Sequence, residues 1–420
     1  MAGCAALIDG RPRQRLPAAA GGARRALLRA VLALAMLAGL SACTTVLSRS
    51  AVPEDAIDRA KPYGIDDPLL RVWGDALTPE NAERIVALRA KSFRAAYSDE
   101  IARGEAIRHV SLALSGGGPD GAFGAGLLAG WTARGDRPEF DVVTGVSTGA
   151  ILAIFAFLGP EYDDTLREIY TAYETDDLVV RTLFAGLTGG TALLDTRGYR
   201  ALIERYLDDA VMAEIAEAYR RNRLLLIGTT NIDASRPVIW NIGAIAASGH
   251  PQARRLVHDV LQASSAIPAA FPPAIIPVEA GGRSHDEMHV DGGATQQVML
   301  YSPALRTTDI DEALGVEIDR TVYVVMNNKL SKPYSPVRPR VFSIAGTAAS
   351  SLIGGSGSGD IYRIFTVAQR DGLDLRITAI PPGFDAEPEE MFDPAYMTAL
   401  YELGEDIGRS GEAWSSHPPD

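Results

Sequence analysis

One stretch of the sequence, residues 140–158, constrains the fold more than any other. It reads FDVVTGVSTGAILAIFAFL, in which one apolar run ends in GVSTG and a second run with helical spacing follows at once. This order predicts a strand, a sharp turn and a buried helix, with Ser147 at the turn. A side chain at Gly145 or Gly149 would collide with the adjoining strand or helix, so the two glycines mark Ser147 as a candidate nucleophile.

Beyond residue 105, apolar strand-like runs alternate with helical stretches along most of the chain. Such alternation predicts an α/β fold in which helices cover a parallel sheet. Helices are expected at 121–134, 148–158 and about 394–407, and strands at 109–115, 141–145, 223–232, 274–278, 321–327 and 373–380.

Four segments are expected along the chain. Residues 1–42 are a signal peptide, 43–104 a polar tether and lead-in, 105–330 the catalytic domain, and 331–420 a C-terminal extension packed on that domain. The lead-in contains a helix capped by Thr78. Within the later segments, residues 160–222 are a helical, charged cap or insertion, and the GGSGSG run at 354–359 is either a loop or a mobile flap.

The beginning of the chain resembles a bacterial export signal. Arg24, Arg25 and Arg29 precede an apolar stretch at 30–40, which is shorter than the ~20 residues needed to span a bilayer. The following Leu-Ser-Ala-Cys resembles a lipobox, which predicts that Cys43 is lipidated and becomes the N-terminus. A plain secreted protein with a chance cysteine at this position is the alternative.

Cysteine content and net charge limit the disulfides that the chain can form and the kinds of molecule that it can bind. The two cysteines, Cys4 and Cys43, lie in or beside the signal, so the mature chain forms no internal disulfide. Its formal charge is −13, and removal of 1–42, with six Arg and one Asp, makes it about −18. Nucleic acid is therefore a poor partner, and membrane attachment would depend on acyl chains rather than on a basic face. No Asp follows Cys43, which favours the outer membrane within a bacterial envelope; the oligomeric state stays open.

A glycine-rich loop at 115–121, SGGGPDG, also follows a predicted strand and opens a helix. Consecutive glycines allow a tight turn that presents backbone N–H groups, and a helix N-terminus adds positive partial charge. Gly116, Gly117 and Gly118 therefore form a candidate oxyanion hole. A phosphate-binding loop is the alternative, but no GK[ST] follows to place a lysine and a Mg²⁺ ligand.

A serine nucleophile needs a base, and the histidines fit this role poorly. By chain order and surroundings each is expected to be a surface or packing residue: His109, ahead of the first strand, and His250, His258, His285, His289 and His417. The best acidic candidate is Asp291, where a strand end meets Gly292 and Gly293. An isolated Asp-Gly-Gly is more often a simple turn.

Taken together, GGGPDG at 116–121, GVSTG at 145–149 and DGG at 291–293, with ASSAIP at 263–268 leading into FPP, resemble the patatin-like phospholipase family. The resemblance covers about residues 107–330. It implies a three-layer α/β/α fold with a mainly parallel central sheet and a Ser-Asp dyad. Many family members carry Arg or Lys where Asp120 stands, so cationic help to the oxyanion is in doubt here.

The resemblance implies a lipid acyl hydrolase that needs no metal and no cofactor. Ser147 would be the nucleophile and Asp291 its base, acting through an acyl-enzyme on a lipid ester. An aspartate with its ordinary pKa of about 3.9 is a weak base, so burial must raise that pKa. The alternatives are an acyltransferase and a non-catalytic surface lipoprotein with the same fold. Phe155, Phe157 and Leu158 are expected to be core rather than an acyl tunnel.

Overall fold

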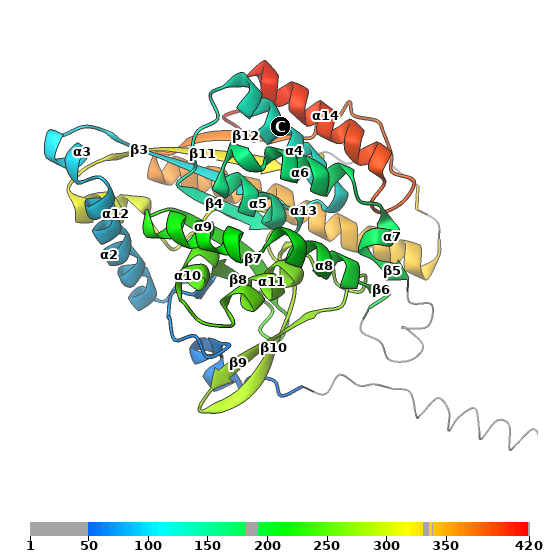
Figure 1. Ribbon diagram of the computed structural model, residues 1–420, viewed down its shortest axis with the longest axis horizontal. Coiled ribbons are helices and arrows are strands. Elements are labelled where there is room, and N and C mark those ends of the chain that lie inside the picture. Colours follow the sequence, from blue (N-terminus) through cyan, green and yellow to red (C-terminus); the bar gives the residue numbers. More distant parts are fainter. Residues whose placement is uncertain (1–48, 182–191, 331–335, 338, 419–420) are drawn as a thin grey trace, which may run out of the picture. The chain divides into compact units, whose positions relative to one another are not determined.

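The computed structural model describes residues 49–181, 192–330, 336–337 and 339–418, which belong to one compact unit (Figure 1). Cys43 and the signal-like segment before it lie outside the described residues, so the predicted anchor stays a prediction. None of the helices in the described ranges is both long and apolar enough to cross a bilayer.

A mixed sheet forms the centre of the described part of the chain. Strands β7, β4, β3, β11 and β12 are neighbours in this order and run parallel, whereas β1, β9, β10, β8 and β2 add antiparallel pairs beside β7. The ten strands are β1 (Lys61–Pro62), β2 (Arg71–Trp73), β3 (Ile107–Leu114), β4 (Val142–Val146), β7 (Leu224–Asn231), β8 (Arg236–Asn241), β9 (Ala274–Ala280), β10 (Arg283–Asp291), β11 (Ile318–Met326) and β12 (Asp374–Ala379). Two further short strands, β5 (Val180–Arg181) and β6 (Leu194–Asp195), pair with each other.

Helices cover both faces of the sheet. The larger core packs the sheet against one set: α4 (Gly121–Arg134), α5 (Thr148–Leu158), α6 (Asp163–Thr171), α7 (Thr175–Leu178), α8 (Arg197–Tyr206), α9 (Asp209–Arg220), α10 (Ile242–Ala247), α11 (Ala253–Ser264) and α14 (Pro394–Ser410). Two smaller cores hold the other set: α2 (Pro79–Ala96), α12 (Thr307–Leu314) and α13 (Val341–Asp371), with α3 (Ser98–Arg103) beside α2. The predicted three-layer α/β/α fold with a mainly parallel sheet is confirmed (Figure 1).

Local sequence explains where α2 begins and where α4 ends. Thr78 Oγ1 accepts the N–H of Asn81 at 3.2 Å, and Pro79 occupies the first position of α2. Gly135 ends α4 in the left-handed region at φ 91°, where glycine avoids the Cβ penalty. Both α4 and α5 have the bounds that their apolar periodicity predicts.

The GGSGSG run at 354–359 is neither a loop nor a flap. It lies inside α13, a helix of 31 residues. The interpretation from composition was wrong because tertiary contacts fix this segment: a Cβ on Gly357 would lie 3.5 Å from Gln297 and Met326. Directly after the run, Asp360 Oδ2 accepts the N–H groups of Gln297 and Val298 at 2.6 and 3.2 Å.

Candidate active site

Ser147 lies at the turn between β4 and α5, in a strained backbone conformation. Its φ of 55° and ψ of −125° lie in a region that residues other than glycine rarely adopt. The chain packs so closely that a Cβ on Gly145 would lie 2.2 Å from the carbonyl oxygen of Gly149. A Cβ on Gly149 would lie 2.4 Å from that of Leu114. The turn therefore has no room for a side chain on either flank of the serine.

Sheet register brings Asp291 to this turn from the other half of the chain. Val146 of β4 pairs with Gly228 of β7, and the next β7 residue, Thr229, pairs with Asp291 at the end of β10. The Ser147 Oγ–H donates to Asp291 Oδ2 at 2.7 Å. The second carboxylate oxygen, Oδ1, accepts the Gly293 N–H at 2.7 Å, which fixes the orientation of the carboxylate.

Burial changes the acidity of this carboxylate. Asp291 is 6 % exposed and Ser147 7 %. Burial disfavours the charged form of Asp291 and raises its pKa to about 6, while the hydrogen bonds from Ser147 and Gly293 oppose the shift. Asp291 is therefore a stronger base than an ordinary aspartate and is still mostly ionised at neutral pH.

The glycine loop after β3 lies beside Ser147, but its three glycines differ in function. The N–H of Gly116 donates to the Gln297 carbonyl at 2.9 Å, so this group fixes the loop and is not free to bind an oxyanion. A Cβ on Gly117 would lie 2.0 Å from the Asn327 carbonyl oxygen, and Gly118 has a φ of 61°. Within the described ranges, no acceptor takes the N–H of Gly117 or Gly118, which leaves these two as donors for an oxyanion.

A cavity of about 460 Å³ opens above the two side chains. Asp120 and Lys329 are its charged members besides Asp291. Asp120 accepts a hydrogen bond from Tyr396 Oη at 2.7 Å, and burial raises the pKa of Asp120 to about 6. The apolar part of the lining is large enough for an acyl chain: Ile151, Ile169, Leu178, Leu202, Ile267, Phe271, Phe392 and Met397.

Ser264 is a supporting residue whose specific role cannot be predicted from its local sequence pattern. Its Oγ accepts the Ser147 N–H at 2.9 Å and donates to the Gly228 carbonyl at 2.7 Å. Ser264 is fully buried at the end of α11, so it fastens the strained turn to the neighbouring strand. Ser264 lies in the run ASSAIP, which is one of the segments that resemble the patatin-like phospholipase family.

The described histidines make other contacts. His289 lies between Thr229 Oγ1 and Glu287 Oε2, at 3.0 and 3.1 Å, and His258 Nε2 contacts the Leu207 carbonyl at 2.8 Å. His109 is inside β3, so its expected position ahead of the strand was wrong. Phe155 and Phe157 are core residues, 2 % and 0 % exposed, as predicted. No group of three His, Cys, Asp or Glu in the described part of the chain is placed to hold a metal ion.

A strained serine between a parallel strand and a helix, bonded to a buried aspartate in a three-layer α/β/α fold, is the arrangement expected from the resemblance to the patatin-like class of proteins. Residues 112–303 match the model of the patatin-like phospholipase family, and the chain carries a domain of this family. The family supports lipid acyl hydrolase activity in general.

Comparisons with curated proteins and with solved structures found less similarity. No curated protein matches the chain. Among solved structures, the crystal structure of VipD from Legionella pneumophila is similar at a TM-score of 0.31 and 11% identity, covering 72% of this chain. The match spans 66% of the VipD chain, just under two thirds of that protein.

Proposed function

We propose that the protein hydrolyses acyl esters of lipids, with Ser147 as nucleophile and Asp291 as general base. The observation that carries this proposal is the 2.7 Å hydrogen bond between Ser147 Oγ and Asp291 Oδ2 at a strained strand-to-helix turn. An activated nucleophile is recognised by such contact with its base. The apolar cavity above the pair and the family of the domain both favour a lipid ester as substrate.

The first half of the reaction forms an acyl-enzyme. Asp291 takes the proton from Ser147 as Oγ attacks the ester carbonyl, and the N–H groups of Gly117 and Gly118 bind the resulting oxyanion. The bond from the carbonyl carbon to the alcohol oxygen then breaks. The proton held by Asp291 passes to the leaving alcohol, so charge and atoms balance at the end of this step.

The second half releases the fatty acid. Asp291 takes a proton from water, the hydroxide oxygen attacks the acyl carbon, and the same two amides bind the second oxyanion. Collapse returns the proton to Ser147. If an alcohol such as glycerol or a lysolipid replaces water, the product is a new ester, and product analysis with either added alcohol separates hydrolysis from transfer.

A fluorophosphonate probe tests the nucleophile directly. We expect the wild type to be labelled and Ser147→Ala to lose all labelling, while Asp291→Asn is labelled far more slowly. The control is Ser284→Ala, which removes an exposed hydroxyl on β10. Equal labelling of wild type and Ser147→Ala would exclude Ser147 as the nucleophile.

A panel of radiolabelled phospholipids, lysophospholipids and glycerides then identifies the ester bond that is cleaved. If the probe labels Ser147 but no lipid of the panel is hydrolysed, the result would favour a binding lipoprotein.

We also propose that the mature protein is anchored in the bacterial envelope through lipidated Cys43, with the outer membrane favoured. The support comes from the sequence alone: a short apolar stretch after three arginines, then Leu-Ser-Ala-Cys, with Thr44 and no Asp after the cysteine. An anchored enzyme would lie next to lipid esters, which agrees with the proposed substrate class.

A further inference from the structure

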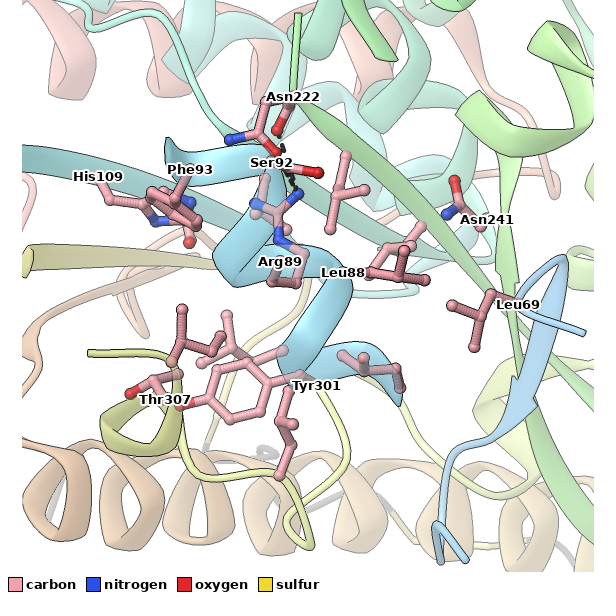
Figure 2. A pocket seen from close by; sticks show the side chains of 18 of the residues that line it. Leu69, Leu88, Arg89, Ser92, Phe93, His109, Asn222, Asn241, Tyr301 and Thr307 are labelled. Carbon is pink, nitrogen blue, oxygen red and sulfur yellow. Dashed lines mark hydrogen bonds between the residues drawn. The ribbon is translucent and has the colours of Figure 1, made fainter. Parts of the chain in front are cut away.

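A second and larger cavity has a volume of about 800 Å³. Figure 2 shows side chains that line it. It lies between α2, the sheet and the segment before α12, and it shares no lining residue with the catalytic cavity. Alternate strand residues point to opposite faces, and the cavity is lined by Ser111 and Val142, whose neighbours Leu112 and Val143 belong to the core that includes α5. The cavity is therefore on the other face of the sheet.

The lining of this cavity combines an apolar wall with positive charge. No Asp or Glu belongs to it in the described part of the chain, although the protein as a whole has a formal charge of −13. The cations are Arg89, Lys91, Arg220, Arg221 and Arg320, of which Arg220 and Arg221 pair with Glu217 and Arg320 pairs with Asp311. The apolar wall includes Leu69, Val72, Leu77, Leu88, Leu226 and Ile239. A ligand that complements this surface has one anionic group and a long apolar part.

In the described part of the chain, His109 at one end of the cavity has no hydrogen-bond partner, and Arg89 has a neutral partner but no ion pair. His109 is 7 % exposed, and neither ring nitrogen has a hydrogen-bond partner among the described residues. The Arg89 guanidinium bonds to Asn222, at 2.8 Å to Oδ1 and 3.3 Å to the carbonyl, as Figure 2 shows. No carboxylate within the described ranges lies within 4.0 Å of Arg89.

The electrostatics of these groups also favour an anion. Burial lowers the pKa of His109 to about 3, and repulsion from Arg89 and Arg320 adds to this shift. Burial lowers the pKa of Arg89 to about 10. A negative charge at this end of the cavity would oppose both shifts, and it would give the Arg89 guanidinium a charged acceptor in addition to the neutral Asn222.

We propose that this cavity binds a free long-chain fatty acid, with the carboxylate at Arg89 and His109 and the alkyl chain along the apolar wall toward Leu69 and Leu88. Arg89 supplies the charge, and its guanidinium carbon lies 5.1 Å from the centroid of the Phe93 ring. Leu88 is 45 % exposed, so the chain reaches the cavity from solvent at that side. The site requires no turnover at Ser147 and is separate from the proposed reaction.

Displacement of a fluorescent fatty acid from the full-length protein tests the site. With cis-parinaric acid as the bound probe, we expect palmitate to displace it and hexadecanol, which lacks the charge, to displace it weakly. Arg89→Met removes the charge, keeps an unbranched side chain, and should raise the Kd for palmitate roughly tenfold or more. The control Arg84→Met is on the same helix outside the lining, where Arg84 pairs with Glu80, and should leave the Kd unchanged. Equal affinities of the two variants, or equal displacement by acid and alcohol, would overturn the site.

A second measurement locates the bound fatty acid by photolabelling. A palmitate analogue that carries a diazirine on its chain should label wild-type peptides from residues 79–96 and 219–226 after irradiation. Arg89→Lys, which keeps the charge, should retain most of this labelling. Labelling confined to residues around 147–151 would place the fatty acid in the catalytic cavity instead and would contradict the proposal. Since neither readout is hydrolysis, its failure leaves the proposed reaction standing.

Discussion

In the proposed Ser147–Asp291 dyad, the surroundings of the Asp291 carboxylate make it fit to accept a proton. Burial raises the pKa of Asp291 from its ordinary value to about 6, and only the ionised form can act as the base. We therefore expect kcat/KM to rise with pH through an acid limb near 6 and then level off. The measurement is a pH–rate profile on a soluble ester substrate, with Asp291→Asn as the comparison. A limb near 4 would mean that the carboxylate is not desolvated in the working enzyme.

The same shift makes a prediction for stability, with its sign set by linkage. The folded state holds the Asp291 proton more tightly than the unfolded state, since the folded pKa is the higher of the two. The stabilisation from this group is therefore complete below about pH 4 and is lost as pH rises through about 6. Thermal unfolding of Asp291→Asn should lack this loss between pH 4 and 7, with Ser284→Ala as the control that keeps it.

Ser264 is a positioning residue for the strained turn. Ser264→Ala leaves the Ser147 N–H and the Gly228 carbonyl without their shared hydroxyl, which should lower the free energy of unfolding by about 1–3 kcal/mol. The turn should also relax, so that fluorophosphonate labelling of Ser147 slows. Ser302→Ala, a second buried serine away from the turn, is the control for loss of any buried hydroxyl. Slow labelling in both variants would show that Ser264 has no specific role.

At the scale of elements, close packing ties α4, which begins after the glycine loop, to the C-terminal helix α14. A Cβ on Gly126 would lie 1.9 Å from the Tyr401 carbonyl oxygen, and a Cβ on Gly404 would lie 2.2 Å from that of Phe123. Gly404→Ala should therefore force the helices apart at a cost of about 1–3 kcal/mol or more, measured by denaturant unfolding. Gly383→Ala, where no atom lies within 4 Å, should change stability by less than about 0.5 kcal/mol. Similar losses in the two variants would contradict a close helix contact.

The elements that sequence predicts best are those whose period is strong and whose ends are marked by glycine. The helices α4 and α5 are of this kind, since Gly135 and Gly159 directly follow their last residues. The run at 354–359 failed because its fate depends on distant contacts with Gln297 and Met326, and composition does not show these contacts. The antiparallel strand β8 was missed for a similar reason, since its pairing with β7 is what defines it.

The same contrast between local patterns and distant contacts applies to the residues of the candidate active site. Ser147 and the glycine loop are candidates from their local patterns, whereas Asp291, in an Asp-Gly-Gly that alone favours a simple turn, is a candidate as the third motif of a set. The register of β4, β7 and β10 brings Ser147 and Asp291 together. That Gly116 uses its N–H on the Gln297 carbonyl depends on a residue far away in the sequence, and no local pattern shows it. The cavity beside α2 is lined by residues from several elements that are far apart in the sequence, so no local sequence pattern predicts it.

At the scale of the whole molecule, charge and anchor make a joint prediction about membrane association. With residues 1–42 removed, as we propose, the formal charge would be about −18, which disfavours attraction to anionic lipid, so attachment would depend on acyl chains at Cys43. Salt screens charge but leaves acyl-chain insertion intact, since the Debye length is about 3 Å at 1 M. We therefore expect the wild type to stay in the membrane fraction in 1 M salt and to incorporate labelled palmitate. Cys43→Ser should lose the label and accumulate as an unprocessed precursor, whereas Cys4→Ser should behave as wild type. Release of the wild type by salt, or label retained by Cys43→Ser, would contradict the anchor.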